Sequence, residues 1–186
     1  VSNNQYDSKR LSLALDSKGN PVVAWHQHIG GGAQYEIYMK RWNGNAWQEL
    51  GSSATGGGIS DNAGVSLFPS LALDRYGNPV VAWSDEATGN EEIYIKRWDG
   101  SSWVEIGAGS ATGQGISSNG GTLGTEENDD GGAPSIILDA LGSPIVAWSD
   151  DRVKDDRVKG GGDYEIYAKK WNGTDWVGIG PSAWSG

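Results

Sequence analysis

Three copies of one short phrase constrain the fold more than any other feature of this sequence. The copies are GNPVVAW from Gly19, GNPVVAW from Gly77 and GSPIVAW from Gly142. A second phrase follows each copy, and it reads EIYMKRWNGNAW from Glu36, EIYIKRWDGSSW from Glu92 and EIYAKKWNGTDW from Glu165. Agreement of this kind at a long period indicates homologous structural repeats. We place the three repeat units at residues 1–58, 59–115 and 116–186.

Each repeat has the pattern of four short antiparallel strands. In the first unit, residues 11–16 and 36–42 alternate between apolar and polar side chains, whereas residues 21–25 are apolar throughout and begin with Pro21. Alternation is typical of a strand with one buried face, and a continuous apolar run is typical of a strand buried on both faces. Asn43-Gly44 is a strong hairpin signal and predicts a last short strand at Trp47.

The fold prediction is therefore all-β, with three tandem four-stranded antiparallel units that resemble β-propeller blades. A propeller has about 4–8 blades, so three units are too few to close a ring. A repeat also cannot bury its apolar face alone, which predicts that copies of the chain associate with one another. The alternative is a single closed three-fold domain, either a β-trefoil or a β-prism.

The phrase LALDSKGNPVVAW resembles the Asp-box repeats of sialidase-type propellers. The resemblance rests on Asp16, Gly19 and Trp25 and on their counterparts in the other two units. It implies that these residues fold a hairpin turn and have a structural role. The phrase RWDGSSW is more loosely similar to blades of propeller lectins, which implies sugar sites that recur with the repeat. No arginine cluster or tyrosine nucleophile matches the sialidase pattern, so we predict that the chain is not an enzyme.

Composition and charge exclude two classes of partner. The net charge is −10, which disfavours binding to nucleic acid or to anionic membranes. No apolar run approaches the roughly 18 residues that span a bilayer, so we expect no membrane insertion. The chain begins with Val1 and contains no cysteine. We take it for a processed secreted protein and expect an extracellular or cell-surface location.

Acidic and aromatic side chains next to the repeated phrases are the candidate ligand-binding residues. Those residues are Asp85, Glu86, Asp150, Asp151, Tyr35 and Tyr164. Clustered carboxylates suit Ca²⁺, but no calcium-binding spacing is present, and we predict no cofactor. His26 and His28 share one face of a strand and are weak candidates for a metal site, because no third ligand is identifiable.

Three further residues receive an interpretation. Trp184 has no aromatic counterpart in the other units, and with Val1 it is assigned to a contact between copies of the chain. Asn172 begins an Asn-Gly-Thr glycosylation sequence, although a hairpin turn explains the same residues.

The sequence therefore favours a self-assembling structural module, forming a closed oligomer or a filament. The alternative is a carbohydrate-binding, lectin-like module whose partners are glycans. A glycosidase is the least favoured function, because no catalytic motif is present.

Overall fold

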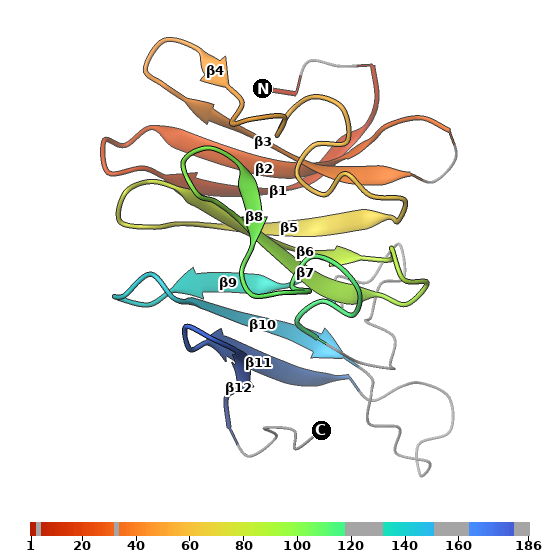
Figure 1. The fold of residues 1–186 in the computed structure, drawn as a ribbon. Coiled ribbons are helices and arrows are strands. Elements are labelled where there is room, and N and C mark those ends of the chain that lie inside the picture. Colours follow the sequence, from red (N-terminus) through yellow and green to blue (C-terminus); the bar gives the residue numbers. More distant parts are fainter. Residues whose placement is uncertain (3–4, 32–33, 118–131, 151–163, 181–186) are drawn as a thin grey trace.

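A computed structural model describes residues 1–186 apart from 3–4, 32–33, 118–131, 151–163 and 181–186. The described residues form twelve strands in three four-stranded antiparallel sheets, which lie one after another along the molecule (Figure 1). We call them blade 1, blade 2 and blade 3. Blade 1 contains β1 (Ser8–Leu15), β2 (Pro21–His28), β3 (Tyr35–Trp42) and β4 (Trp47–Gln48). Blade 2 contains β5 (Ser66–Leu73), β6 (Pro79–Asp85), β7 (Glu92–Trp98) and β8 (Trp103–Glu105). Blade 3 contains β9 (Ser135–Leu138), β10 (Pro144–Asp150), β11 (Glu165–Trp171) and β12 (Trp176–Gly178).

The architecture confirms the all-β prediction with four strands per unit. Strand order within each sheet follows the chain, and β5 lies against β1 on one side and β9 on the other. The sheets are thus successive blades, not the three parts of one closed trefoil or prism. No helix in the described part of the chain is long and apolar enough to cross a membrane.

The aspartate and glycine of the repeated phrase form the first hairpin turn of each blade. In blade 1, Asp16 Oδ1 accepts hydrogen bonds from the backbone N–H groups of Lys18 and Asn20, both at 2.8 Å. Gly19 has a φ of +79°, which glycine adopts without steric cost. The same bonds recur around Asp74 and Asp139. These residues therefore have the structural role that the Asp-box resemblance implies.

The hydrophobic core lies between the blades. One buried cluster joins blades 1 and 2, and it consists of Val22, Ala24, Ile37, Met39, Ile59, Leu71, Val81, Trp83, Tyr94 and Ala111. The other joins blades 2 and 3, and it consists of Val80, Ala82, Ile93, Ile95, Ile106, Ile116, Ile136, Val146, Trp148 and Tyr167. Apart from Trp25 and Tyr38 of blade 1, the buried apolar side chains therefore lie where neighbouring blades cover each other.

Both junctions between blades use the same three hydrogen bonds. A serine Oγ on the inner strand of one blade accepts from a backbone N–H of the next, as in Leu71 to Ser12 and Ile136 to Ser70. A tryptophan Nε1 donates back to a carbonyl, as in Trp103 to Leu50 and Trp176 to Ile106. A lysine Nζ does the same, as in Lys96 to Ile59 and Lys169 to Ile116. The repeats thus specify a repeating junction as well as a repeating sheet.

Candidate functional site

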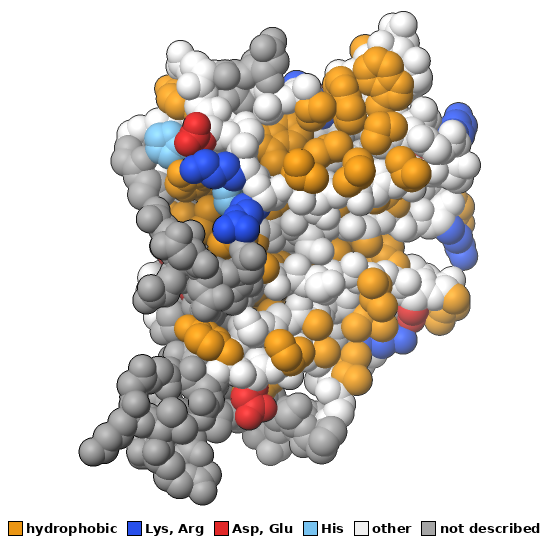
Figure 2. Space-filling model, turned by 180° about the vertical axis from the view of Figure 1, so that it is seen from behind, with side chains coloured by type: hydrophobic (Ala, Val, Ile, Leu, Met, Phe, Trp, Pro, Cys, Tyr) orange, Lys and Arg blue, Asp and Glu red, His pale blue; other side chains and the backbone are white. Residues whose placement is uncertain are grey.

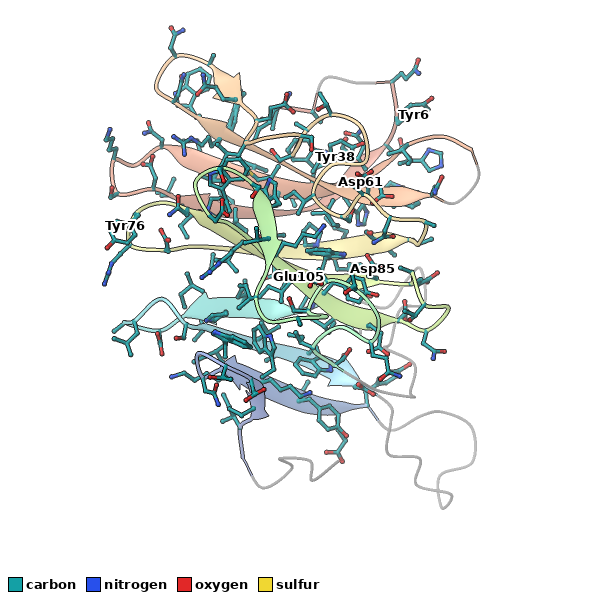
Figure 3. All side chains as sticks on the ribbon, in the orientation of Figure 1. Tyr6, Tyr38, Asp61, Tyr76, Asp85 and Glu105 are labelled. Carbon is teal, nitrogen blue, oxygen red and sulfur yellow. The ribbon has the colours of Figure 1, made fainter. Side chains whose placement is uncertain are left out.

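The structure buries Asp85 and Asp150, two of the predicted ligand-binding residues. Both carboxylates are buried at the last position of a strand, Asp85 in β6 and Asp150 in β10. Figure 3 labels Asp85. Asp85 Oδ2 accepts hydrogen bonds from Trp83 Nε1 at 2.7 Å, Asn62 Nδ2 at 2.7 Å and Ser66 Oγ at 2.9 Å. Asp150 accepts from Trp148 Nε1 at 3.3 Å. These two acids hold the repeated tryptophans in place, because residues two apart on a strand share one face.

The histidines lie on one strand face, as predicted, but they pack against aromatic rings. The ring of Tyr35 contacts both His26, at 5.3 Å between centroids, and His28, at 5.1 Å. His26 is buried, its Nδ1 accepts from the backbone N–H of Phe68, and burial lowers its pKa to about 4. Across the ranges that the structure describes, no three His, Cys, Asp or Glu residues come together as metal ligands.

The remaining predicted site residues do not converge on one place. Glu86 and Tyr164 are exposed at the ends of different blades. Val1 lies beside blade 1, where its carbonyl oxygen accepts a hydrogen bond from Lys40 Nζ at 3.0 Å. Asp151 and Trp184 lie outside the described residues. Their proposed roles in ligand binding and assembly remain predictions.

Two cavities at the junction of blades 2 and 3 form a better candidate site, and Trp171 lines both. The smaller has a volume of about 190 Å³, and its lining includes Asp74, Asn78, Arg97, Trp98, Leu141 and Trp171. The larger has a volume of about 310 Å³, and its lining includes Ser110, Lys169, Trp171, Thr174, Asp175 and Trp176. Aromatic surface together with a few charged and polar groups is typical of a small-molecule site.

Contacts with blade 2 fix the position of the Trp171 indole. The ring lies so close to Gly107 that a Cβ atom there would come within 2.6 Å of it, and therefore only glycine fits. Trp176 packs across the hairpin from Trp171, with 5.9 Å between ring centroids, and its Nε1 donates to Ile106 O at 2.8 Å. The two tryptophans are paired directly across the β11–β12 hairpin. Because both indoles are held by the neighbouring blade, the site exists only where two blades meet.

Charged side chains line each cavity. Lys169 comes from β11, the strand that carries Trp171, and Arg97 comes from β7, the equivalent strand of blade 2. Lys169 Nζ donates to Ile116 O at 2.7 Å and lines the larger cavity, while Arg97 of β7 lines the smaller one. Asp74 contributes a carboxylate whose oxygens also hold its own turn, with bonds of 2.8 to 3.0 Å. Neither Lys169 nor Arg97 is among the site residues predicted from the sequence. The signal available was the run of basic residues directly before each tryptophan, as in Arg97-Trp98 and Lys169-Lys170-Trp171.

The sequence matches no model of a known protein family and no curated protein. Solved structures, in contrast, share its fold. A fucose lectin from Kordia zhangzhouensis, solved in complex with methyl-fucoside, is 16% identical, with a TM-score of 0.52 over 94% of this chain and 99% of the lectin chain. The endo-arabinase of Bacteroides thetaiotaomicron is 18% identical, with a TM-score of 0.57 over 98% of this chain and 63% of its own. The α-L-arabinanase of Penicillium chrysogenum, complexed with arabinobiose, is 15% identical, with a TM-score of 0.52 over 98% of this chain and 51% of its own.

At these identities the likeness establishes the β-propeller type of fold. The chain spans about half to two thirds of the length of the two arabinan-degrading enzymes, but nearly the whole lectin chain. The sialidase-type origin of the repeats stays a prediction. The prediction that the chain is not an enzyme is wrong: several similar structures are glycoside hydrolases, a thermostable family-43 enzyme among them. A missing motif therefore does not exclude catalysis on this fold.

Proposed function

We propose that this chain is a carbohydrate-binding protein whose sugar sites lie at the junctions between blades. One observation carries the proposal: the indole of Trp171, held by blade 2, stands between two cavities that Arg97 and Lys169 also line. The face of an indole is electron-rich and attracts the polarised C–H groups on the apolar face of a sugar ring. The charged groups then bind the hydroxyls, which gives orientation and selectivity.

The fold comparisons support a carbohydrate ligand over other small molecules. The fucose lectin was solved with a bound sugar, and the Penicillium arabinanase was solved with a disaccharide. We extend this ligand class to the present chain as part of the proposal, together with its expected location outside the cell.

The repeat makes the proposed site multivalent. Trp98 lies over Gly51 at the junction of blades 1 and 2, as Trp171 lies over Gly107. Lys96 corresponds to Lys169 and donates to Ile59 O at 2.8 Å. Two weak sites on one chain would bind a surface that displays many sugars far more tightly than either site alone.

Calorimetric titration with methyl-fucoside and arabinobiose tests the proposal, with tryptophan fluorescence as a second signal. We expect saturable binding, and we expect Trp171→Ala to remove one site per chain. Arg97→Ala should weaken binding, whereas Arg75→Ala should not, because Arg75 lies on an exposed turn and stacks on Tyr76. Analysis of the arabinobiose sample for free arabinose shows whether bound sugar is also cleaved.

Failure to bind either ligand or any other neutral sugar in a panel at millimolar concentration would refute the carbohydrate function. Equal weakening by Arg97→Ala and Arg75→Ala would refute the assignment of the site. Circular dichroism of each variant separates a lost site from a lost fold.

A further inference from the structure

The two outer faces of the molecule are apolar and exposed. On blade 1, Leu13 is 59% exposed, although its counterpart Leu71 is 7% exposed between blades 1 and 2. On blade 3, Ile166 is 73% exposed, although its counterpart Ile37 is fully buried. Hydrophobic side chains gather at the end of the molecule that holds blade 1 (top of Figure 2), where a cavity of about 360 Å³ is lined by Leu11, Leu13, Val23 and Trp25 among others. Large exposed apolar faces mark interaction surfaces.

The outer face of blade 1 and the outer face of blade 3 carry the two complementary sides of the junction that blades 1 and 2, and blades 2 and 3, form within the chain. Ser12 and Ser70 accept a backbone N–H from the following blade, and Ser135 of blade 3 is the exposed counterpart of both. Leu13 supplies the N–H that corresponds to the donors Leu71 and Ile136.

The tryptophan bond of the junction can be extended in the same way. Trp103 donates to Leu50 O, and Trp176 donates to Ile106 O. By the same register, Trp47 of blade 1 corresponds to the two donors, and Ile179 corresponds to the two acceptors. Ile179 is among the exposed hydrophobic residues, whereas Ile106 is buried. The donor side of the junction is therefore on blade 1 and the acceptor side is on blade 3.

Val1 supplies the most specific part of the match. The Lys40 Nζ group donates to Val1 O at 3.0 Å, as Lys96 donates to Ile59 O at 2.8 Å and Lys169 to Ile116 O at 2.7 Å. Val1 therefore stands on blade 1 where the linker from a preceding blade would stand. In sequence, Val1-Ser2 corresponds to Ile59-Ser60 and to Ile116-Ser117.

The internal linkers show what such a pair contacts on the preceding blade. Ile59 N donates to Ile37 O at 2.7 Å, Ile37 N donates to Ser60 Oγ at 2.8 Å, and Ser60 Oγ donates to Glu36. Ile116 and Ser117 make the same bonds to Ile93 and Glu92. In blade 3 the corresponding residues, Glu165 and Ile166, are exposed.

We infer that two copies of this chain pair head to tail, with blade 3 of each copy seated against blade 1 of the other. Val1-Ser2 of one copy then lies on Glu165-Ile166 of the second. Two copies supply six blades, within the roughly 4–8 of a closed propeller, whereas three copies would exceed that range. A head-to-tail contact that closes forms a ring, and the two junctions of the pair are equivalent. The pairing does not depend on sugar binding, but it creates two further junctions of the kind that hold the proposed sugar site.

Sedimentation velocity and light scattering over a dilution series test the pairing. We expect a discrete species at twice the 19.7 kDa mass of the chain. Leu13→Asp and Ile166→Asp each place a charge in both junctions of the pair, so each variant alone should be a monomer. Tyr76→Asp is the matched control, because Tyr76 lies on a turn and is 72% exposed, close to the 73% of Ile166, and it should leave the dimer intact.

Mixing the two variants distinguishes a head-to-tail contact from a symmetric one. Leu13→Asp keeps an unaltered blade 3 face, and Ile166→Asp keeps an unaltered blade 1 face, so their mixture should recover dimers through one intact junction. A monomeric parent chain, or an Ile166→Asp variant that still dimerises, would overturn the inference. A ladder of high-mass species would overturn the closed pair in favour of an open filament. Circular dichroism confirms that each variant is folded.

Discussion

Replacing Glu36 with glutamine should stabilise this protein above neutral pH and leave its stability unchanged in acid. Glu36 is buried at the start of β3, where the Ser60 hydroxyl donates to its Oε2 and the Ser66 hydroxyl lies 3.5 Å from the same oxygen. Burial, opposed in part by the Ser60 bond and assisted by the charge of Asp85, raises the pKa of Glu36 to about 7. Glutamine keeps the size and the acceptor but cannot ionise.

The sign and size of the effect follow from proton linkage. Between the ordinary pKa of 4.5 and about 7, the folded chain holds a proton on Glu36 that the unfolded chain has lost. The free energy of unfolding therefore falls as the pH rises through this window. At about 1.4 kcal/mol per pH unit the total loss is up to roughly 3 kcal/mol, and it is complete above the folded-state pKa. Glu36→Gln removes this loss.

His26 contributes a slope of the opposite sign in an overlapping window. Burial first, and then the charges of Arg10 and Lys9, lower the pKa of His26 from 6.5 to about 4. The unfolded chain binds the extra proton here, so stability is present above pH 6.5 and is lost as the pH falls towards 4. In the parent chain the slopes of Glu36 and His26 offset each other. In Glu36→Gln, the contribution of His26 to the pH dependence of the free energy of unfolding is no longer offset by that of Glu36.

Urea unfolding followed by tryptophan fluorescence, at several pH values from roughly 4 to 8, measures this difference. Protein concentration must be constant, because association shifts apparent stability. Asp7→Asn is the control, since Asp7 is an exposed carboxylate in a surface ion pair with Lys9. A stability difference between Glu36→Gln and the parent that does not change with pH would refute the reasoning, as would a less stable variant at roughly pH 8.

Two substitutions test the packing between blades by chemical denaturation. Met39→Ala empties part of the cluster between blades 1 and 2 and should cost about 2–5 kcal/mol, whereas Leu141→Ala on an exposed turn should cost far less; similar losses would contradict the burial. Gly58→Ala should cost much more than Gly56→Ala. Both glycines have positive φ, but only at Gly58 would a Cβ meet the Ile37 carbonyl oxygen, so equal effects would show that this approach is looser.

Local structure was predictable from sequence because it depends on neighbouring residues. Alternation, the Asn43-Gly44 hairpin and the Asp16 turn are each encoded within a few positions. The candidate site was not predictable in this way, since Trp171 meets Gly107 only after blades 2 and 3 stack. The burial of Asp85 was missed for a related reason: its spacing of two from Trp83 indicates a shared strand face, but an acid at a strand end is ordinarily exposed.

The position of the core between the sheets has a consequence for how such a chain can evolve. Stability resides in the junctions, so duplication of one repeat adds one complete junction made of side chains that already fit each other. No new core has to arise, and the duplicated segment need only contain one whole repeat. Blade number can therefore change in single genetic steps, while substitutions that improve one junction can be copied into the others.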